Sequence, residues 1–110
     1  MSTAPTIVDL RAPVDTPSDG IVSRAIYSDD DVRVVLFSFA PGQQLSDHTA
    51  PMPATLEVVE GEADITLGDD HIAGQPGTWV HMPANTPHSV VAKTPVTLLL
   101  HLLKRGSQAG

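Results

Sequence analysis

The sequence predicts an all-β protein in which short antiparallel strands pack as a sandwich or barrel. Ten prolines and eight glycines are distributed along the 110 residues. Together with the β-branched runs between them, they leave no stretch of a dozen residues suited to a helix. Short runs of β-branched and apolar residues recur between turn signals, as in antiparallel sandwiches and barrels. The length is enough for one domain.

The expected elements follow in order along the chain. Residues 1–20 contain several prolines and are expected to form an arm, which is a candidate edge strand or exchanged strand. Residues 21–104 form the expected barrel, and its breaks carry the Pro, Gly, Asn or Asp that turns favour. The tail at 105–110 is expected to fray. The strands are expected at 21–27, 32–39, 55–60, 63–67, 78–82, 88–92 and 96–103.

The charge balance argues against nucleic acid and membrane surfaces as partners. Thirteen Asp and Glu stand against six Lys and Arg, which gives a formal charge of -7 and an isoelectric point near 4.8. The basic residues form no stripe, whereas phosphate backbones and anionic lipids require a basic patch. Every apolar run is far shorter than the roughly 20 residues that span a bilayer. The first residues carry no signal-peptide pattern, so we expect a cytoplasmic protein.

Histidine and carboxylate are the strong metal-ligand types that this chain can offer. Cysteine is absent, which excludes disulfides, thiolate ligands and a cysteine nucleophile. Histidine occurs five times. The positions are His48, His71, His81, His88 and His101.

Two spaced motifs contain a pair of these histidines. In the first, five residues separate Gly42 from His48, and Gly61 closes the next hairpin. The second reads Gly77-Thr-Trp-Val-His-Met-Pro-Ala-Asn-Thr-Pro-His88. Both motifs, in this order, resemble those of the cupin superfamily over about residues 36–92. The resemblance implies an antiparallel jelly-roll β-barrel, the cupin fold of a small single-domain member of the type-2 conserved-barrel kind. It also implies a homodimer, and many cupins hold one divalent metal through three His and one Glu.

The chain departs from the cupin pattern at the metal ligands. His48 and His88 stand at the first and last histidine positions of the motifs. Ala50 stands at the second histidine position, and Ala54 stands at the glutamate position. Glu57 cannot replace the missing acid, because alternate residues of a strand face opposite sides and Glu57 is out of phase with Ala54. The expected ligand-binding residues are therefore His48, His88, Ala50 and Ala54, and the expected metal ligands are His48 and His88.

Two imidazoles would hold a metal weakly, with water or a bound molecule completing the coordination shell. Zinc, nickel, copper or iron would suit such a site, whereas magnesium and calcium require oxygen ligands. His101 is a candidate third ligand because it is embedded in the apolar strand at 96–103. The alternative is a hydrogen-bonded core histidine. A protein that binds no metal is a further hypothesis.

Three functions are compatible with these residues. The first is a metal-assisted oxygenase, isomerase or lyase acting on a small molecule at His48 and His88. The second is a metal-free small-molecule-binding or sensor cupin without catalysis, in which Ala50 and Ala54 leave volume and the imidazoles orient a polar ligand. The third is a metal-free enzyme with one histidine as general base. The sequence therefore leaves open whether the protein is an enzyme.

The remaining features concern the surface. His81 alternates with Trp79 on a strand face that the cupin resemblance places outside the cavity, where surface or dimer contact is expected. His71 follows a turn and is expected to be a solvated hairpin-tip histidine. The arm at residues 6–10 alternates apolar and polar side chains, so it suits an edge strand added to a partner. A homodimer is expected, since a domain of this size buries a marginal core.

Overall fold

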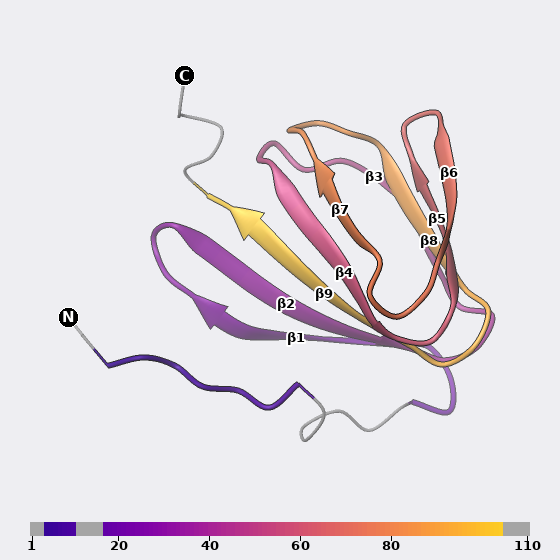
Figure 1. Cartoon of the computed structure of the whole chain (residues 1–110), viewed down its shortest axis with the longest axis horizontal. Helices are drawn as coiled ribbons and strands as arrows, with labels where there is room; N and C mark the ends of the chain where they lie inside the picture. Colours follow the sequence, from indigo (N-terminus) through magenta and orange to yellow (C-terminus); the bar gives the residue numbers. More distant parts are fainter. Residues whose placement is uncertain (1–3, 11–16, 105–110) are drawn as a thin grey trace.

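The computed structural model describes residues 4–10 and 17–104, with the backbone alone at positions 47 and 48. These residues contain nine strands in two antiparallel sheets that face each other (Figure 1). The five-stranded sheet has the order β1-β2-β9-β4-β7, and the four-stranded sheet has the order β3-β8-β5-β6. The strands are β1 (Ile21–Ser28), β2 (Val32–Phe39), β3 (Gln44–His48), β4 (Ala54–Glu60), β5 (Ala63–Leu67), β6 (Asp70–Gly74), β7 (Trp79–Met82), β8 (His88–Ala92) and β9 (Val96–Leu103).

The main core lies between the two sheets. Alternation along β4 places Ala54, Leu56 and Val58 in this core, while the residues between them are only half-buried. The expected inward phase of β4 is therefore confirmed. The largest fully buried side chains come from both sheets and include Phe39, Ile65, Leu98, Val58, Val90 and Val96.

A second apolar cluster covers the outer face of the five-stranded sheet. Val34, Leu36 and Leu99 are buried there, and Leu10 of the N-terminal arm packs against them. Residues 4–10 thus lie against this face, and no strand is assigned within them. The central strands β2 and β9 are consequently covered on both faces, which explains why their sequences are almost continuously apolar.

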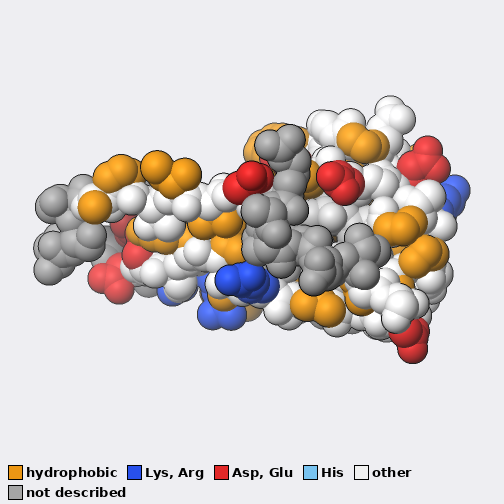
Figure 2. Space-filling view, turned by 90° about the horizontal axis from the view of Figure 1, so that it is seen from below, with side chains coloured by type: hydrophobic (Ala, Val, Ile, Leu, Met, Phe, Trp, Pro, Cys, Tyr) orange, Lys and Arg blue, Asp and Glu red, His pale blue; other side chains and the backbone are white. Residues whose placement is uncertain are grey.

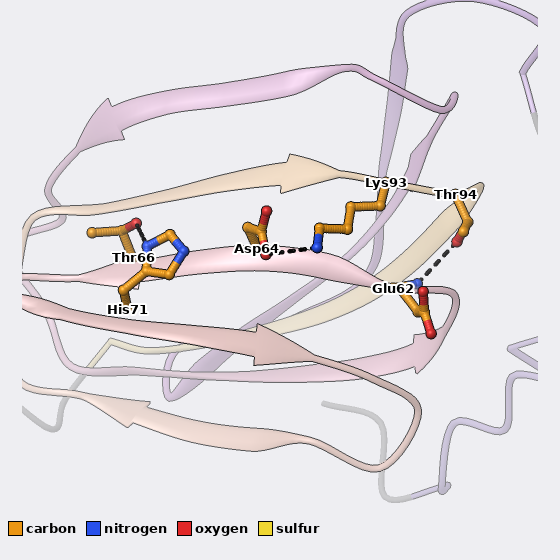
Figure 3. Close-up of polar contacts among 6 residues, drawn as sticks. All are labelled: Glu62, Asp64, Thr66, His71, Lys93 and Thr94. Atoms are coloured by element: carbon orange, nitrogen blue, oxygen red, sulfur yellow. Dashed lines mark hydrogen bonds and ion pairs between the residues drawn. The ribbon is translucent and has the colours of Figure 1, made fainter.

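The outer face of the four-stranded sheet is polar (Figure 3). Thr66 Oγ1 and His71 Nδ1 share a hydrogen bond of 3.0 Å across β5 and β6. Lys93 Nζ lies 3.5 Å from a carboxylate oxygen of Asp64. His71 is therefore exposed, as expected, but it belongs to a strand and pairs with Thr66, so its assignment to the hairpin tip was wrong.

Two turns show why particular residues stand at the motif positions. Gly61 has a φ of 87°, and a Cβ at this position would overlap the backbone carbonyl oxygen of Pro95. Asn85 has a φ of 65° and stands where the cupin motif has glycine. Asparagine is among the non-glycine residues that best tolerate this left-handed conformation. The departure from the motif at this position therefore preserves the turn.

The all-β antiparallel fold class is confirmed, and all seven expected strands are present. The two sheets are separate hydrogen-bonded sheets and do not close into a continuous barrel. Two strands, β3 and β6, were not expected, because Gln44–His48 is short and mostly polar and Asp70–Gly74 is short with one large apolar residue, Ile72. The expected frayed tail at 105–110 lies outside the described residues. Within the described ranges, no helix is long and apolar enough to cross a membrane.

Candidate functional site

His88 is the buried histidine at the start of β8. Its side chain is 7% exposed and borders the space between the sheets. The Nδ1 atom lies 3.0 Å from the backbone carbonyl oxygen of Thr86. A carbonyl oxygen can only accept, so the His88 Nδ1–H donates this hydrogen bond. In the neutral ring Nε2 then carries the lone pair, which is the arrangement that suits a metal ligand or a hydrogen-bond acceptor.

The backbone register brings His48 next to His88. His48 ends β3 and is the ladder partner of His88, after a register shift between Leu45 and His48. The β7–β8 and β3–β4 loops lie at the same end of the sandwich (Figure 1). The fold thus brings together, as neighbouring backbone positions, the two histidines that the sequence motifs place 40 residues apart. The side chain of His48 is outside what the structure describes.

Ala54 and Ala50 occupy different kinds of position. Ala54 is 3% exposed, begins β4 in the opposite sheet, and pairs with Met82 and Leu102. Ala50 lies in the loop after β3, and its carbonyl oxygen accepts a 2.8 Å hydrogen bond from the Asn85 N–H. Positions 48 and 50 therefore do not share a strand face, because β3 ends at His48.

The space beside His88 is small and apolar. Its volume is about 20 Å³, which is close to the minimum for a single water molecule. Among the described side chains, no cluster of three or more His, Asp or Glu could hold a metal ion. The described side chains alone therefore do not assemble a closed four-ligand shell, whereas one imidazole with a second histidine paired to it fits weak binding. The other residues lining the space are Phe37, Leu45, Leu56, Val90, Leu98 and Leu100.

His101 faces away from His88. On β9, Leu98 and Leu100 pack in the core between the sheets, so the alternate residues Leu99 and His101 lie on the outer face. His101 lines a groove of about 420 Å³ beneath the N-terminal arm. The structure thus corrects the expectation of His101 as a third ligand, because the sheet itself separates the two imidazoles. The groove is otherwise lined by Ala4, Pro5, Thr6, Val8, Leu10, Ile26, Tyr27, Val34 and Leu99.

His81 and Trp79 lie on the outer face of the same sheet, as expected. Both are exposed, and Trp79 is 60% exposed. His81 pairs with Thr55, and Thr55 pairs with His101 on its other side. These residues therefore lie on the same outer sheet face as the groove. His88 borders the space on the other side of that sheet.

The groove is the feature that sequence reasoning missed. Its signal is present in the middle of β2, where Val34 and Leu36 alternate with Val35 and Phe37, so that both faces are apolar there. Such a continuous apolar run indicates a strand covered on both faces. The alternating pattern of residues 6–10 predicts an edge strand for a partner. Because the arm is separated from β2 in sequence, no local signal shows that it covers this face of its own sheet.

A hydrogen-bonded pair lies at the turn between β1 and β2. The Tyr27 hydroxyl donates to a carboxylate oxygen of Asp29 at 2.5 Å. The other carboxylate oxygen accepts the N–H groups of Asp31 and Val32. The hydrogen bond from Tyr27, followed by the backbone donors, lowers the pKa of Asp29, and the same bond raises the pKa of Tyr27. This pair stabilises the turn that follows the groove-lining end of β1.

The facing sheets, the motif turns and the paired histidine positions define a small jelly-roll domain with a reduced metal-ligand set. The cupin domain family matches residues 35–102, more than half of the chain, and the chain belongs to this family. A comparison with curated proteins gives no match.

Several solved structures are similar over nearly the whole chain. A conserved protein of unknown function from Streptococcus pyogenes shares 28% identity and a TM-score of 0.81, with 94% of this chain and 96% of that chain covered. An RmlC-like cupin from Desulfovibrio desulfuricans shares 25% identity and a TM-score of 0.83, covering 92% and 98% of the two chains. A cupin superfamily protein from Desulfitobacterium hafniense shares 28% identity and a TM-score of 0.77, covering 82% and 83%.

Proposed function

We propose that this protein is a small-molecule-binding cupin whose site is the His48–His88 pair, with a divalent transition metal held weakly there. The observation that carries the proposal is the hydrogen bond from His88 Nδ1–H to the Thr86 carbonyl. Metal-ligating histidines commonly donate their other ring N–H to a backbone carbonyl, which fixes the tautomer and the ring orientation. The ladder pairing of His48 with His88 supports a second imidazole at the same place.

The ligand count sets the strength and kind of binding. Two imidazoles favour zinc, nickel, copper or iron over magnesium and calcium. His48 and His88 would hold the metal and would leave part of its coordination shell to water or to the bound molecule, so the affinity would be below that of a closed site. Such a metal supplies Lewis-acid or redox chemistry, as in oxygenase, isomerase or lyase reactions. The space beside His88 is only about 20 Å³, so the bound molecule lies at the strand ends and not between the sheets.

A second candidate is metal-free binding of a small molecule. It is favoured by the apolar lining around His88 and by the lack of a three-ligand cluster among the described side chains. In that case His88 Nε2 accepts a hydrogen bond from a hydroxyl or N–H group of the ligand. The rest of the molecule lies at the strand ends, because the space between the sheets beside His88 is only about 20 Å³.

Calorimetric titration of the untagged protein with zinc and with nickel tests the proposal. The parent should contain less than one equivalent of metal, release it to mild chelation and rebind it weakly. His88→Gln should lower the affinity at least about tenfold, because it removes a ligand and its oriented ring. His71→Gln is the matched control, since His71 is exposed on the outer face of the other sheet. It should bind like the parent.

Two results would overturn the metal-binding reading. No binding under any loading condition would leave the metal-free candidate, which thermal stabilisation by small molecules without metal would support. Tight stoichiometric binding that survives His88→Gln would place the metal elsewhere.

We also propose that the protein is a homodimer. The support is the number of large apolar side chains that the monomer leaves exposed, including Ile7 at 90% and Trp79 at 60%. Size-exclusion chromatography with light scattering should give twice the chain mass at micromolar concentration. A monomer mass there would contradict the proposal.

A further inference from the structure

Arg33, the second residue of β2, belongs to the inner face of the five-stranded sheet. It pairs with Leu102 of β9, and Leu102 packs against the core between the sheets. Residues that pair directly across antiparallel strands lie on the same face. Phe37, which is in phase with Arg33 along β2, borders the space beside His88. Arg33 is nevertheless exposed, because it lies where β2 begins, at one end of the sandwich.

The strand register places Arg33 in the same row as Ala54. Leu102 pairs with Arg33 on one side and with Ala54 on the other, so two strand spacings, about 10 Å, separate the Cα atoms of Arg33 and Ala54. Ala54 begins β4, directly after the loop that starts from His48. Arg33 therefore lies at the end of the sandwich where His48 and His88 are paired. An extended arginine side chain and a small molecule can together span this separation.

The other basic side chains that the structure describes are engaged or face elsewhere. Lys93 belongs to the ion pair on the outer face of the four-stranded sheet. Lys104 Nζ donates hydrogen bonds at the β1–β2 turn, one of them at 2.7 Å to the backbone carbonyl oxygen of Asp29. Arg24 pairs with Leu36, a member of the outer apolar cluster, so it lies on the opposite face from Arg33.

Arg33 has no such contact. Within residues 4–10 and 17–104, no carboxylate lies within ion-pair distance of its guanidinium group. Asp70 is in the inward phase at the same end, but it lies on β6, the far edge strand of the other sheet. On the side of the molecule that Figure 2 shows, basic side chains form small separate groups and no continuous stripe. In a chain with a net charge of -7, this inward-phase guanidinium is a local site for an anion.

We infer that Arg33 sets the class of ligand: the molecule bound at the His48–His88 pair carries a carboxylate, which the Arg33 guanidinium binds. The inference rests on the function proposed above and names the class of its ligand. A guanidinium group presents its N–H donors in a planar fork that matches the two oxygens of a carboxylate. Another oxygen or nitrogen atom of the same molecule then lies at the histidine pair.

The charge at this end favours a carboxylate over a phosphate. A carboxylate carries one negative charge, which a single guanidinium balances. A phosphate monoester carries nearly two at neutral pH, and Arg33 is the one described basic side chain in the inward phase at this end. The excess of acidic residues over the whole chain disfavours any further uncompensated negative charge.

Calorimetric titration of the full chain with succinate, malate and glutarate, each compared with its neutral diamide, tests the inference. At least one of the three acids should bind, and its diamide should bind at least about tenfold more weakly, because a hydrogen bond to a charged group is lost. Arg33→Gln should weaken binding of that acid at least about tenfold and leave zinc binding as in the parent. Arg33→Lys keeps the charge without the fork and should recover part of the loss.

Arg24→Gln is the matched control, since Arg24 is exposed on the other face of the same sheet. It should bind the acids like the parent. All variants should keep the circular dichroism spectrum of the parent, because both arginines are exposed.

The outcomes separate this inference from the function on which it rests. Binding of an acid that Arg33→Gln leaves unchanged would contradict the role of Arg33, and weak zinc binding in the same samples would leave the proposed metal site standing. Binding of an acid through Arg33 in a protein that binds no zinc would contradict the metal site and support the ligand class.

Three further results would overturn the ligand class itself. The first is the absence of binding by all three acids, and the second is equal binding of the acids and their diamides. The third is tighter binding of glycerol phosphate than of every acid, with loss of that binding in Arg33→Gln, which would identify a phosphate site.

Discussion

The space between the sheets and the groove beneath the arm differ in volume, lining and histidine. The inner space holds about 20 Å³ beside His88, and the groove holds about 420 Å³ beside His101. Both are bordered by β9, whose alternate residues supply the two linings. The place where the cupin motifs meet has thus kept its histidines but little volume, whereas the larger apolar hollow lies outside the core.

The larger cavity volume of the groove is not by itself a reason to place ligand binding there. The larger hollow is lined by the arm, and its histidine has no second titratable group among the residues lining it except Tyr27. The smaller space has a histidine whose tautomer is fixed by a backbone carbonyl and whose ladder partner is a histidine. These contacts are the reason why we propose ligand binding at the inner position and not in the outer groove.

The largest expected effect is on the free energy of unfolding, and it should differ between the two faces of β9. Leu98 is 1% exposed between the sheets, whereas Leu99 is 8% exposed beneath the arm. Leu98→Ala should lower the free energy of unfolding toward the upper end of the roughly 2–5 kcal/mol range for such truncations, and Leu99→Ala toward its lower end. The outer site loses fewer packed neighbours because one side adjoins the groove. Urea denaturation at one fixed protein concentration measures both, and an equal or reversed order would contradict the distinction.

Restoring the two missing motif ligands should change the free energy of unfolding less than Leu98→Ala does. It should have a large effect on metal affinity. Ala50→His with Ala54→Glu should raise the affinity for zinc or nickel at least about tenfold, which corresponds to roughly 1.4 kcal/mol. Without metal the double variant should be less stable than the parent, because Ala54 is buried and a carboxylate there is desolvated.

Titration calorimetry and thermal melts with increasing metal check this prediction. The single variant Ala54→Glu shows how much of the gain in metal affinity depends on the histidine at position 50. Because Ala50 lies in the loop beyond the end of β3, Ala54→Glu alone should give part of that gain. A double variant that folds and binds metal no better than the parent would show that these positions do not face the histidine pair.

The smallest expected effect is the pH dependence contributed by the Tyr27–Asp29 pair. The pKa of Asp29 is lowered in the folded protein, so its contribution is present above the unfolded value of about 3.9 and is lost as the pH falls through the lower folded value. The pKa of Tyr27 is raised, so its contribution is present below about 10 and is lost as the pH rises through the folded value.

Asp29→Asn should therefore flatten both limbs of the stability profile. Urea midpoints measured from acid to alkaline pH provide the comparison, and Asp70→Asn, at the start of β6, is the control. A parent profile that the Asp29 substitution leaves unchanged in the acid range would contradict the role of this pair at the turn.

The fold was largely predictable because its signals are local. Turn residues and β-branched runs mark each of the seven long or apolar strands, and the spaced glycines of the motifs fix the hairpins. The strands β3 and β6 were missed because Gln44–His48 is mostly polar and Asp70–Gly74 is a short run with one large apolar residue, Ile72. Their pairing depends on β8 and β5, which no local pattern reveals.

The candidate site was only partly predictable. Spacing within the motifs identified His48 and His88, and the alternation rule placed Ala54 and Glu57 on opposite faces of β4 correctly. The rule does not extend to Ala50, because β3 ends at His48 and that end cannot be read from the sequence. The face of His101 was not predictable either, since every neighbour in Val96–Leu103 except Thr97 is apolar and both faces are covered.

We propose that His88 binds through Nε2 together with His48. Nitrogen-15 chemical shifts of the five imidazoles, recorded during a zinc titration of the untagged protein, test it most directly. The account predicts that His88 is protonated at Nδ1 before zinc is added, and that zinc shifts the Nε2 resonance of His88 and a ring resonance of His48. His71, His81 and His101 should not respond. A His88 ring protonated at Nε2, or zinc shifts confined to the three outer histidines, would contradict the account.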